Sequence, residues 1–304
     1  MKKKSLRHMS GANRAFYIFN SILWTVILFI VIYPLYFVVI SSISDPNAVM
    51  LGKVIWKPVG ITFVGYESIL ANKQLWISYV NSICYTVLGT TLSIIVTLLT
   101  AYALSCNDLL GKKIINFFFI VPMFFGGGMI PTFLVIKSIG LYNTRWILIL
   151  SGCVTVWNTM VTRTYIKSTI PQELYEASEL DGANHFQYFS RVVCPLSKTI
   201  VSVLTVYYGV AKWNNYMTGL IYIRDRNKLP LQTILREILA TLKAGANLDA
   251  LAGDVSGMAL TEAIEIANLS KYCVIIVSTV PAVLLYLILQ KYFEKGVMIG
   301  SIKG

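Results

Sequence analysis

Three glutamates recur at three-residue steps in one polar stretch of the sequence. Glu173, Glu176 and Glu179 would share roughly one face of a helix. Pro171 can start that helix, because its missing N–H would be unpaired at this position anyway. Acidic residues in a first turn also suit the helix dipole. The spacing therefore predicts a short helix with an acidic rim, which offers ionic contacts and no acid–base chemistry of its own.

A second short helix is expected directly after the first. Asp181 and Gly182 form a turn pair in which glycine supplies the backbone freedom. Residues 183–191 then present Phe186 and Phe189, three positions apart. The stretch predicts a helix-turn-helix with an acidic rim and an aromatic patch. A hairpin lying on a lipid surface is the alternative, but an interfacial helix carries Lys and Arg on its polar face, and this one carries acids.

The rest of the chain contains few residues that could form a catalytic or metal site. The two histidines, His8 and His185, leave a histidine-based triad or metal site almost without ligands. The five cysteines are dispersed, match neither a zinc pattern nor a disulfide framework, and are interpreted as small buried hydrophobic residues. The sequence also lacks a G-x-x-x-x-G-K-[ST] phosphate loop, so ATP is not expected to bind this chain in that manner.

The composition predicts that the segments on either side of this helix-turn-helix lie in a membrane. Of the 304 residues, 56% are apolar and 13% are charged, whereas soluble domains are about half apolar and about a quarter charged. The net charge of +12 alone would suggest nucleic acid, but the apolar excess favours a membrane and no nucleic-acid partner is expected.

Six stretches are apolar enough to cross a bilayer. A span needs about 20 mainly apolar residues, and its backbone groups must pair within the segment, which favours helices. The first stretch could be a secretory signal, but it is about twice as long as a signal core and no small-residue cleavage site follows. The predicted spans are residues 15–44, 74–105, 114–136, 146–162, 199–223 and 272–290.

Six spans place both termini on the same side of the membrane. With the N-terminus inside, the inner segments hold 14 Lys and Arg residues and the outer segments hold 11, as the positive-inside rule expects. We expect one transmembrane domain over residues 15–304 with both termini cytoplasmic. Its polar parts are the cytoplasmic tails 1–14 and 291–304, the cytoplasmic loop 163–198 and the extracellular loop 224–271, in which residues 231–243 predict an amphipathic helix.

The cytoplasmic loop resembles the EAA signature of ABC-importer permeases, which is Glu-Ala-Ala, three residues, Gly, nine residues and Ile-x-Leu-Pro. Here Glu176-Ala177-Ser178 is followed by three residues, Gly182, nine residues and a segment that ends in Cys194-Pro195. The spacing matches throughout, and the substitutions are small. The resemblance implies that the loop couples to ATPase subunits through Glu176, Ala177, Ser178, Asp181, Gly182, Phe186, Phe189 and Pro195.

Most of the chain resembles the permeases of carbohydrate importers of the maltose type. Residues 123–131, 143–146, 222–226 and 229–232 are similar to a subgroup tied to fragments of complex polysaccharides. The resemblance implies an all-α integral membrane protein in the cell membrane, with six transmembrane helices in the type I ABC-importer permease fold and a cytoplasmic EAA helix-turn-helix.

The resemblance also implies a fixed set of partners. A second homologous permease subunit would complete the pore, and two cytoplasmic ABC ATPase subunits would bind the EAA loops. An extracellular solute-binding protein would deliver an oligosaccharide. ATP and Mg would belong to the ATPases, so this chain itself is expected to bind no cofactor.

One charge lies inside a predicted span. Lys212 is near the middle of the fifth span, where a lysine costs roughly 2.5–3.5 kcal/mol on insertion scales. A wet cavity or a partner subunit would avoid much of that cost, and the neighbouring amides and aromatic rings suit sugars. An interfacial aromatic belt with a snorkelling lysine is the alternative. The candidate substrate pathway is Trp157, Asn158, Lys212, Trp213, Asn214, Asn215 and Tyr216.

Three glycines lie inside the third predicted span. Residues 126–128 are all glycine and fall between Pro122 and Pro131. Each glycine in a helix costs about 1 kcal/mol against alanine. The run indicates either a broken third helix beside the pathway or close helix packing through small residues.

Other functions compete with an oligosaccharide permease. An ABC-importer permease for a peptide or amino acid is the nearest alternative. An ion-coupled secondary carrier would normally show intramembrane acids or an inverted repeat, and the six predicted spans contain no Asp or Glu. A membrane-embedded enzyme would need an intramembrane nucleophile with a base, or a metal cluster, for which two histidines give little.

Overall fold

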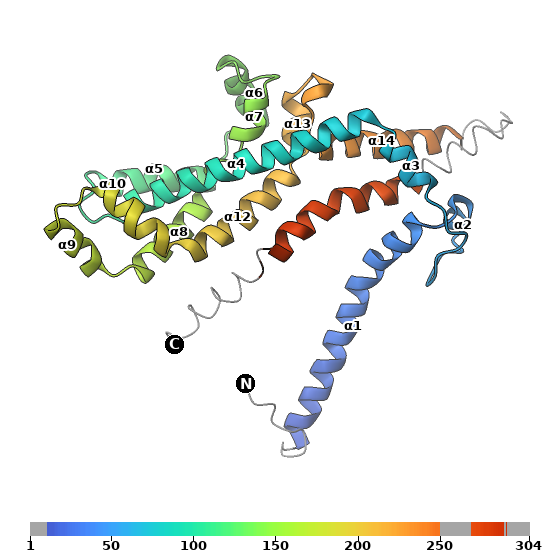
Figure 1. Ribbon diagram of the computed structural model, residues 1–304, viewed down its shortest axis with the longest axis horizontal. Helices are drawn as coiled ribbons and strands as arrows, with labels where there is room; N and C mark the ends of the chain where they lie inside the picture. The colour runs from blue at the N-terminus through green and yellow to red at the C-terminus, as the bar shows by residue number, and fades with distance from the viewer. Residues whose placement is uncertain (1–10, 250–268, 289, 291–304) are drawn as a thin grey trace. The chain divides into compact units, whose positions relative to one another are not determined.

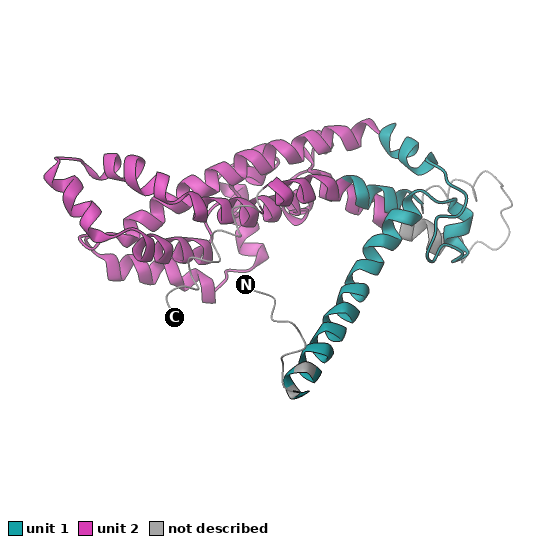
Figure 2. Ribbon diagram, turned by 60° about the horizontal axis from the view of Figure 1, so that its bottom comes forward, with its two compact units in different colours: residues 1–71, 241–277 teal, residues 72–240, 278–304 magenta. Residues whose placement is uncertain are grey.

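The structure is a computed structural model that describes residues 11–249, 269–288 and 290, and the regular elements of these residues are all helical. The chain divides into two units, which are described separately (Figures 1 and 2). One unit comprises residues 1–71 and 241–277, and the other comprises residues 72–240 and 278–304. Residues 1–10 of the expected N-terminal tail, the whole expected tail 291–304 and residues 250–268 of the loop expected over 224–271 lie outside the described residues.

The first unit begins with a long apolar helix. Helix α1 (Gly11–Ser42) exposes nearly all of its side chains between residues 15 and 37. An apolar helix with so little protein around it needs lipid or another subunit as its surroundings. The helix is followed by α2 (Pro46–Met50), which Asp45 caps by accepting a hydrogen bond from the N–H of Ala48, and by α3 (Val64–Leu70).

The second unit is organised around α4 (Lys73–Ser105), a helix of 33 residues that Asn72 caps. Small side chains recur along its buried face at steps of four or seven residues, which lets neighbouring helices approach closely. Helices α8 (Val156–Thr169) and α12 (Lys198–Trp213) pack against α4, and Figure 1 shows them running beside it. The buried small residues on α4 are Ser78, Ser82, Gly89, Ser93 and Thr97.

Three of the predicted spans are continuous helices and three are interrupted. The described residues contain three helices long and apolar enough to cross a bilayer, over Ala15–Ser42, Lys73–Ser105 and Leu269–Ile288. The other predicted spans each divide into two helices: α5 (Lys112–Phe124) and α6 (Met129–Ser138), α7 (Arg145–Leu150) and α8, α12 and α13 (Met217–Tyr222).

Two of the interruptions coincide with local features of the sequence. The glycine run lies between α5 and α6, where Gly128 takes a φ of 82° that side chains resist. The third span is therefore broken, as one of the two interpretations of the glycine run predicted. Between α12 and α13, the side chain of Asn215 accepts a hydrogen bond from the N–H of Thr218 and starts the new helix.

The loop expected to contact ATPase subunits is a helical hairpin. Helix α9 (Gln172–Leu180) follows Pro171, as predicted. The second helix was expected over residues 183–191, but it begins at His185 with α10 (His185–Tyr188) and continues through a π turn (Phe189–Val193) into α11 (Cys194–Leu196). The chain then bends by 78° into α12.

The loop expected over residues 224–271 begins with a well-formed helix. After a short 3-10 turn (Arg226–Lys228), α14 (Leu231–Asp249) starts at the residue predicted for the amphipathic helix. Its first turns are buried on one face through Leu231, Ile234 and Leu235.

Candidate functional site

The turn of the EAA hairpin is set by one glycine. Gly182 has a φ of 73°, a conformation that L side chains rarely adopt. The N–H groups of Asp181, Gly182 and Ala183 return to carbonyl oxygens of α9 at 2.9–3.1 Å, which ends that helix. Asn184 starts the next helix through a reciprocal capping box with Gln187. The predicted turn at Asp181-Gly182 is confirmed.

The acidic rim of the hairpin is exposed. Glu173, Glu176 and Glu179 all lie on the surface of α9. Glu176 accepts a hydrogen bond of 3.2 Å from the side-chain amide of Gln172, which holds its carboxylate beside the start of the helix. The other two residues of the EAA triplet are small and leave the rim open: Ala177 is exposed, and the Ser178 hydroxyl donates to the carbonyl oxygen of Tyr175.

The apolar patch on the hairpin differs from the predicted one. Phe186 is 73% exposed, but the Phe189 ring packs against Tyr102 of α4 at 5.3 Å between centroids. Phe189 therefore holds the hairpin onto the membrane domain and does not belong to the exposed patch. Leu180, at the end of α9, is 91% exposed, so the large apolar side chains exposed on the hairpin include Leu180 and Phe186. The sequence analysis missed Leu180, although a leucine at the end of a polar helix was a visible signal.

Tyrosines attach the hairpin to the C-terminal ends of α4 and α8. The buried Tyr188 ring meets Tyr175 edge-on at 5.3 Å, and the Tyr102 hydroxyl lies 3.1 Å from Nδ1 of His185. Burial raises the pKa of Tyr188 above its ordinary value. Below these rings the hairpin packs on a core that contains Ile166 and Val193. The hairpin is thus fixed at its base and exposed at its turn.

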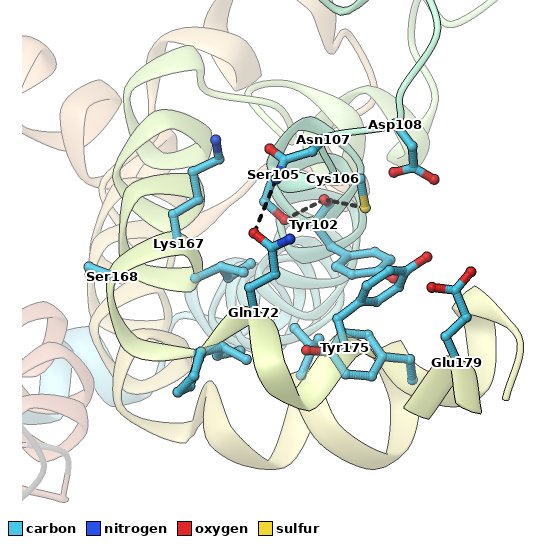
Figure 3. A pocket seen from close by; sticks show the side chains of 15 residues that line it. Tyr102, Ser105, Cys106, Asn107, Asp108, Lys167, Ser168, Gln172, Tyr175 and Glu179 are labelled. Carbon is cyan, nitrogen blue, oxygen red and sulfur yellow. Dashed lines mark hydrogen bonds between the residues drawn. The ribbon is translucent and has the colours of Figure 1, made fainter. Parts of the chain in front are cut away.

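A pocket of about 730 Å³ lies beneath the hairpin (Figure 3). Its walls come from the end of α4, the link after it, the end of α8 and the first turns of α9. Two contacts tie the α4–α5 link to the hairpin beside it. The Asn107 amide donates to Oε1 of Gln172 at 3.4 Å, and Oδ2 of Asp108 lies 3.7 Å from Nε2 of His185.

Lys212 has a different environment from the predicted wet cavity. Its ammonium donates hydrogen bonds to the carbonyl oxygens of Ile149, at 2.7 Å, and of Ser151. These carbonyls lie where α7 ends and would otherwise lack a partner inside the helix. Cys153 Sγ is 3.9 Å from the same ammonium. Lys212 thus satisfies the backbone of an interrupted span, a role that the sequence analysis did not consider.

The rest of the candidate pathway divides into buried and exposed residues. Trp213 is buried, and its indole N–H donates to the carbonyl oxygen of Ser278 at 2.9 Å. Asn158 is also buried. Asn215 caps α13, and the Tyr216 ring lies beneath the guanidinium of Arg236 at 4.7 Å. Only Trp157, which is 61% exposed, and Asn214 present their side chains at the surface of the subunit.

Sequence segments near the N-terminal end of α4 converge on one asparagine. Asn143 has a φ of 57°, and its side-chain oxygen accepts hydrogen bonds from the N–H groups of Arg224 and Asp225 at 3.0 and 3.1 Å. Lys228 donates back to the carbonyl oxygen of Asn143. Segments 143–146 and 222–226, which are far apart in the sequence, are therefore joined by hydrogen bonds. The sequence analysis quoted these segments but assigned them no structural role.

These features define a membrane transport subunit of the ABC-importer class, with broken spanning helices and a projecting helical hairpin. The family described as the inner membrane component of binding-protein-dependent transport systems matches residues 7–299. The chain belongs to this family. Its members are transport components and not enzymes, and membership favours the importer interpretation over an ion-coupled carrier or a membrane enzyme.

Named relatives and a solved structure agree with this membership. The polygalacturonan/rhamnogalacturonan transport system permease protein YtcP of Bacillus subtilis strain 168 is 34% identical over 275 residues, which are 90% of this chain and 93% of the relative. Protein LplC of the same strain is 31% identical over 297 residues, 98% of each chain. A chain of a bacterial ABC transporter involved in import of the acidic polysaccharide alginate matches with a TM-score of 0.82 and 30% identity, covering 94% of this chain and 99% of that one. The type I permease fold is confirmed.

Proposed function

We propose that this chain forms half of the translocation pathway for an oligosaccharide and couples that pathway to two cytoplasmic ATPase subunits. The exposed EAA hairpin is the observation that carries the proposal. It offers three carboxylates and two large apolar side chains, Leu180 and Phe186, at the end of a fixed support. A mixed surface of this kind suits a protein partner, because apolar side chains gain from burial and charges add specificity.

The oligosaccharide substrate is supported by the relatives. Their names include polygalacturonan/rhamnogalacturonan, arabinooligosaccharide and galactooligosaccharide transport. A second permease subunit, an extracellular solute-binding protein and cytoplasmic termini complete the proposed arrangement. The exposed Trp157 and Asn214 are the pathway residues that best keep their proposed role, since an aromatic face and an amide suit sugar C–H groups and hydroxyls.

Reconstitution of the complete importer in proteoliposomes tests the proposal. Uptake of labelled galacturonate, arabinose and galactose oligosaccharides is measured with ATP on the ATPase side and the binding protein on the other side. We expect ATP-dependent uptake of at least one saccharide. A panel of peptides and amino acids provides the comparison. Uptake of a peptide with no uptake of any saccharide would refute the substrate class and leave the coupling hairpin in place.

A further inference from the structure

The pocket beneath the EAA hairpin has the chemistry of a ligand site. Its volume of about 730 Å³ falls within the range of about 300–1,000 Å³ found for small-molecule sites. Three tyrosine rings, from Tyr102, Tyr175 and Tyr188, form its aromatic wall. Polar side chains converge on the same space from the α4–α5 link and from α9, as Figure 3 shows for Asn107 and Gln172.

The charges around the pocket favour a neutral polyhydroxylated ligand. Asp108 and Glu179 lie on one side, and Lys167 lies on the other (Figure 3). Two carboxylates can accept hydrogen bonds from hydroxyl groups, whereas they repel a phosphate or a carboxylate ligand. Tyrosine rings provide flat apolar faces for C–H groups, and amides can both donate and accept. A short neutral saccharide combines these properties.

The position of the pocket connects a bound ligand to the hairpin. One wall belongs to α4 and the link after it, and the opposite wall belongs to α9. The hydrogen bond between the side chains of Asn107 and Gln172 crosses between these walls, and Asp108 in the link also lies 3.7 Å from Nε2 of His185 in α10. Any movement of α9 relative to α4 changes the width of the pocket, so a ligand that bridges both walls binds one arrangement better than another and shifts the population toward it.

We infer that this pocket is a cytoplasmic saccharide site through which neutral sugar released inside the cell restrains the coupling hairpin. The inference rests on the proposed function for its physiological ligand. The site is separate from the transport pathway, because all of its walls lie at the end of α4 that carries the EAA hairpin.

A thiol in the wall of the pocket allows a direct binding test. Cys106 lines the pocket, and burial raises the pKa of its thiol, so alkylation is measured at pH 8.5. The protein is the complete importer in lipid nanodiscs without the binding protein, and the other four cysteines of the chain are replaced by alanine or serine. The probes are 50 mM galactobiose, a neutral disaccharide, and 50 mM digalacturonate.

We expect galactobiose to slow alkylation of Cys106 by N-ethylmaleimide at least fivefold and to lower the ATPase rate of the same sample. Digalacturonate should protect at least tenfold more weakly, because Asp108 and Glu179 oppose it. Asn107→Leu should abolish protection, whereas Ser190→Ala, on an exposed part of the hairpin, should retain it. Both variants are first shown to assemble, and the protection in each is expressed relative to its own alkylation rate without sugar.

Two results would overturn the inference. Absence of protection by galactobiose in the assembled wild-type complex would show that no neutral saccharide occupies the pocket. Equal protection in Asn107→Leu would show that protection arises elsewhere. Oligosaccharide uptake by proteoliposomes is measured separately, so an importer that transports normally without protection of Cys106 contradicts the pocket and leaves the proposed function standing.

Discussion

The ammonium of Lys212 in α12 donates a 2.7 Å hydrogen bond to the carbonyl oxygen of Ile149, at the point where α7 ends. A cation at this point complements the end of the interrupted helix, where the Ile149 oxygen also accepts a hydrogen bond from the Cys153 thiol at 3.1 Å. Gly89 of α4 allows the arrangement, because a Cβ there would lie 3.0 Å from Cε of Lys212 and 3.2 Å from the Ile149 oxygen. A charge within a predicted span thus stabilises a broken helix.

Replacement of Lys212 by methionine should loosen this junction. Lys212→Met removes a costly charge from the bilayer, so insertion should remain normal. Loss of the two hydrogen bonds from Lys212, which leaves the Ile149 oxygen with the Cys153 thiol alone, should lower the stability of the folded subunit by about 1–3 kcal/mol. Alkylation of the buried Cys153 reports the loosening and should accelerate, whereas Lys198→Met, at an exposed position, should leave it unchanged. An unchanged alkylation rate of Cys153 in Lys212→Met would show that the hydrogen bonds of Lys212 contribute little to the stability of the subunit.

Substitutions at Gly182 should uncouple the importer in a graded order. A Cβ at this position meets no atom within 4 Å, so only the backbone conformation with a φ of 73° opposes a side chain. A left-handed residue costs roughly 1–2 kcal/mol for most side chains, and asparagine tolerates the conformation best. ATPase stimulation by the sugar-loaded binding protein should therefore fall least for Gly182→Asn, more for Gly182→Ala and most for Gly182→Val, at equal membrane levels. Wild-type stimulation in Gly182→Val would contradict the role of the turn.

The two phenylalanines of the hairpin should respond differently to truncation. Phe186 is 73% exposed, so Phe186→Ala should weaken ATPase binding without loss of stability. Phe189 packs on Tyr102 and is half-buried, so Phe189→Ala should lower the free energy of unfolding, by less than the loss of about 3–5 kcal/mol found for a fully buried ring, and with it the melting temperature of the subunit. Pull-down of the ATPase and thermal unfolding separate the two effects. Identical behaviour of the two variants would remove the distinction that the structure draws.

Glu176 should contribute to ATPase binding in a way that an outer glutamate does not. Removal of one partner of an interfacial charge pair weakens binding by about 2–5 kcal/mol when the pair is buried, and by less when it lies at the rim of the interface. Glu176→Ala should weaken ATPase association about tenfold or more, whereas Glu67→Ala, on an exposed part of α3, serves as the control. Equal loss in both variants would contradict the proposed topology together with the coupling role.

The sequence predicted the hairpin well because its signals are local. Pro171 before α9, the glycine at position 182 and the spacing of the glutamates each act within a few residues. The boundaries of the second helix were less accurate, because Asn184 and Gln187 form a capping box and a π turn extends the helix past position 191. These features depend on side-chain bonds that spacing alone does not reveal.

The roles of the intramembrane residues could not be predicted, because they depend on contacts between segments far apart in the chain. The partner of Lys212 is a carbonyl 63 residues away, and that of Trp213 is 65 residues away. The apolar character of a segment predicts its place in the bilayer but not an interruption such as the one that ends α7. Hydropathy therefore predicted where the spans lie, and the glycine run indicated a break in the third as one of two interpretations, while the breaks after α7 and after α12 required the structure.

Contact between the EAA hairpin and an ATPase subunit is the central claim, and site-specific photo-crosslinking tests it most directly. A photoreactive amino acid replaces Phe186 in one variant and Phe63, an exposed ring of the outer segment, in the control. The complete importer is irradiated in native membranes and the products are identified by mass. We predict a covalent product between the permease and the ATPase from position 186 and none from position 63. A product with the ATPase from position 63, or none from position 186 in an assembled complex, would contradict the account.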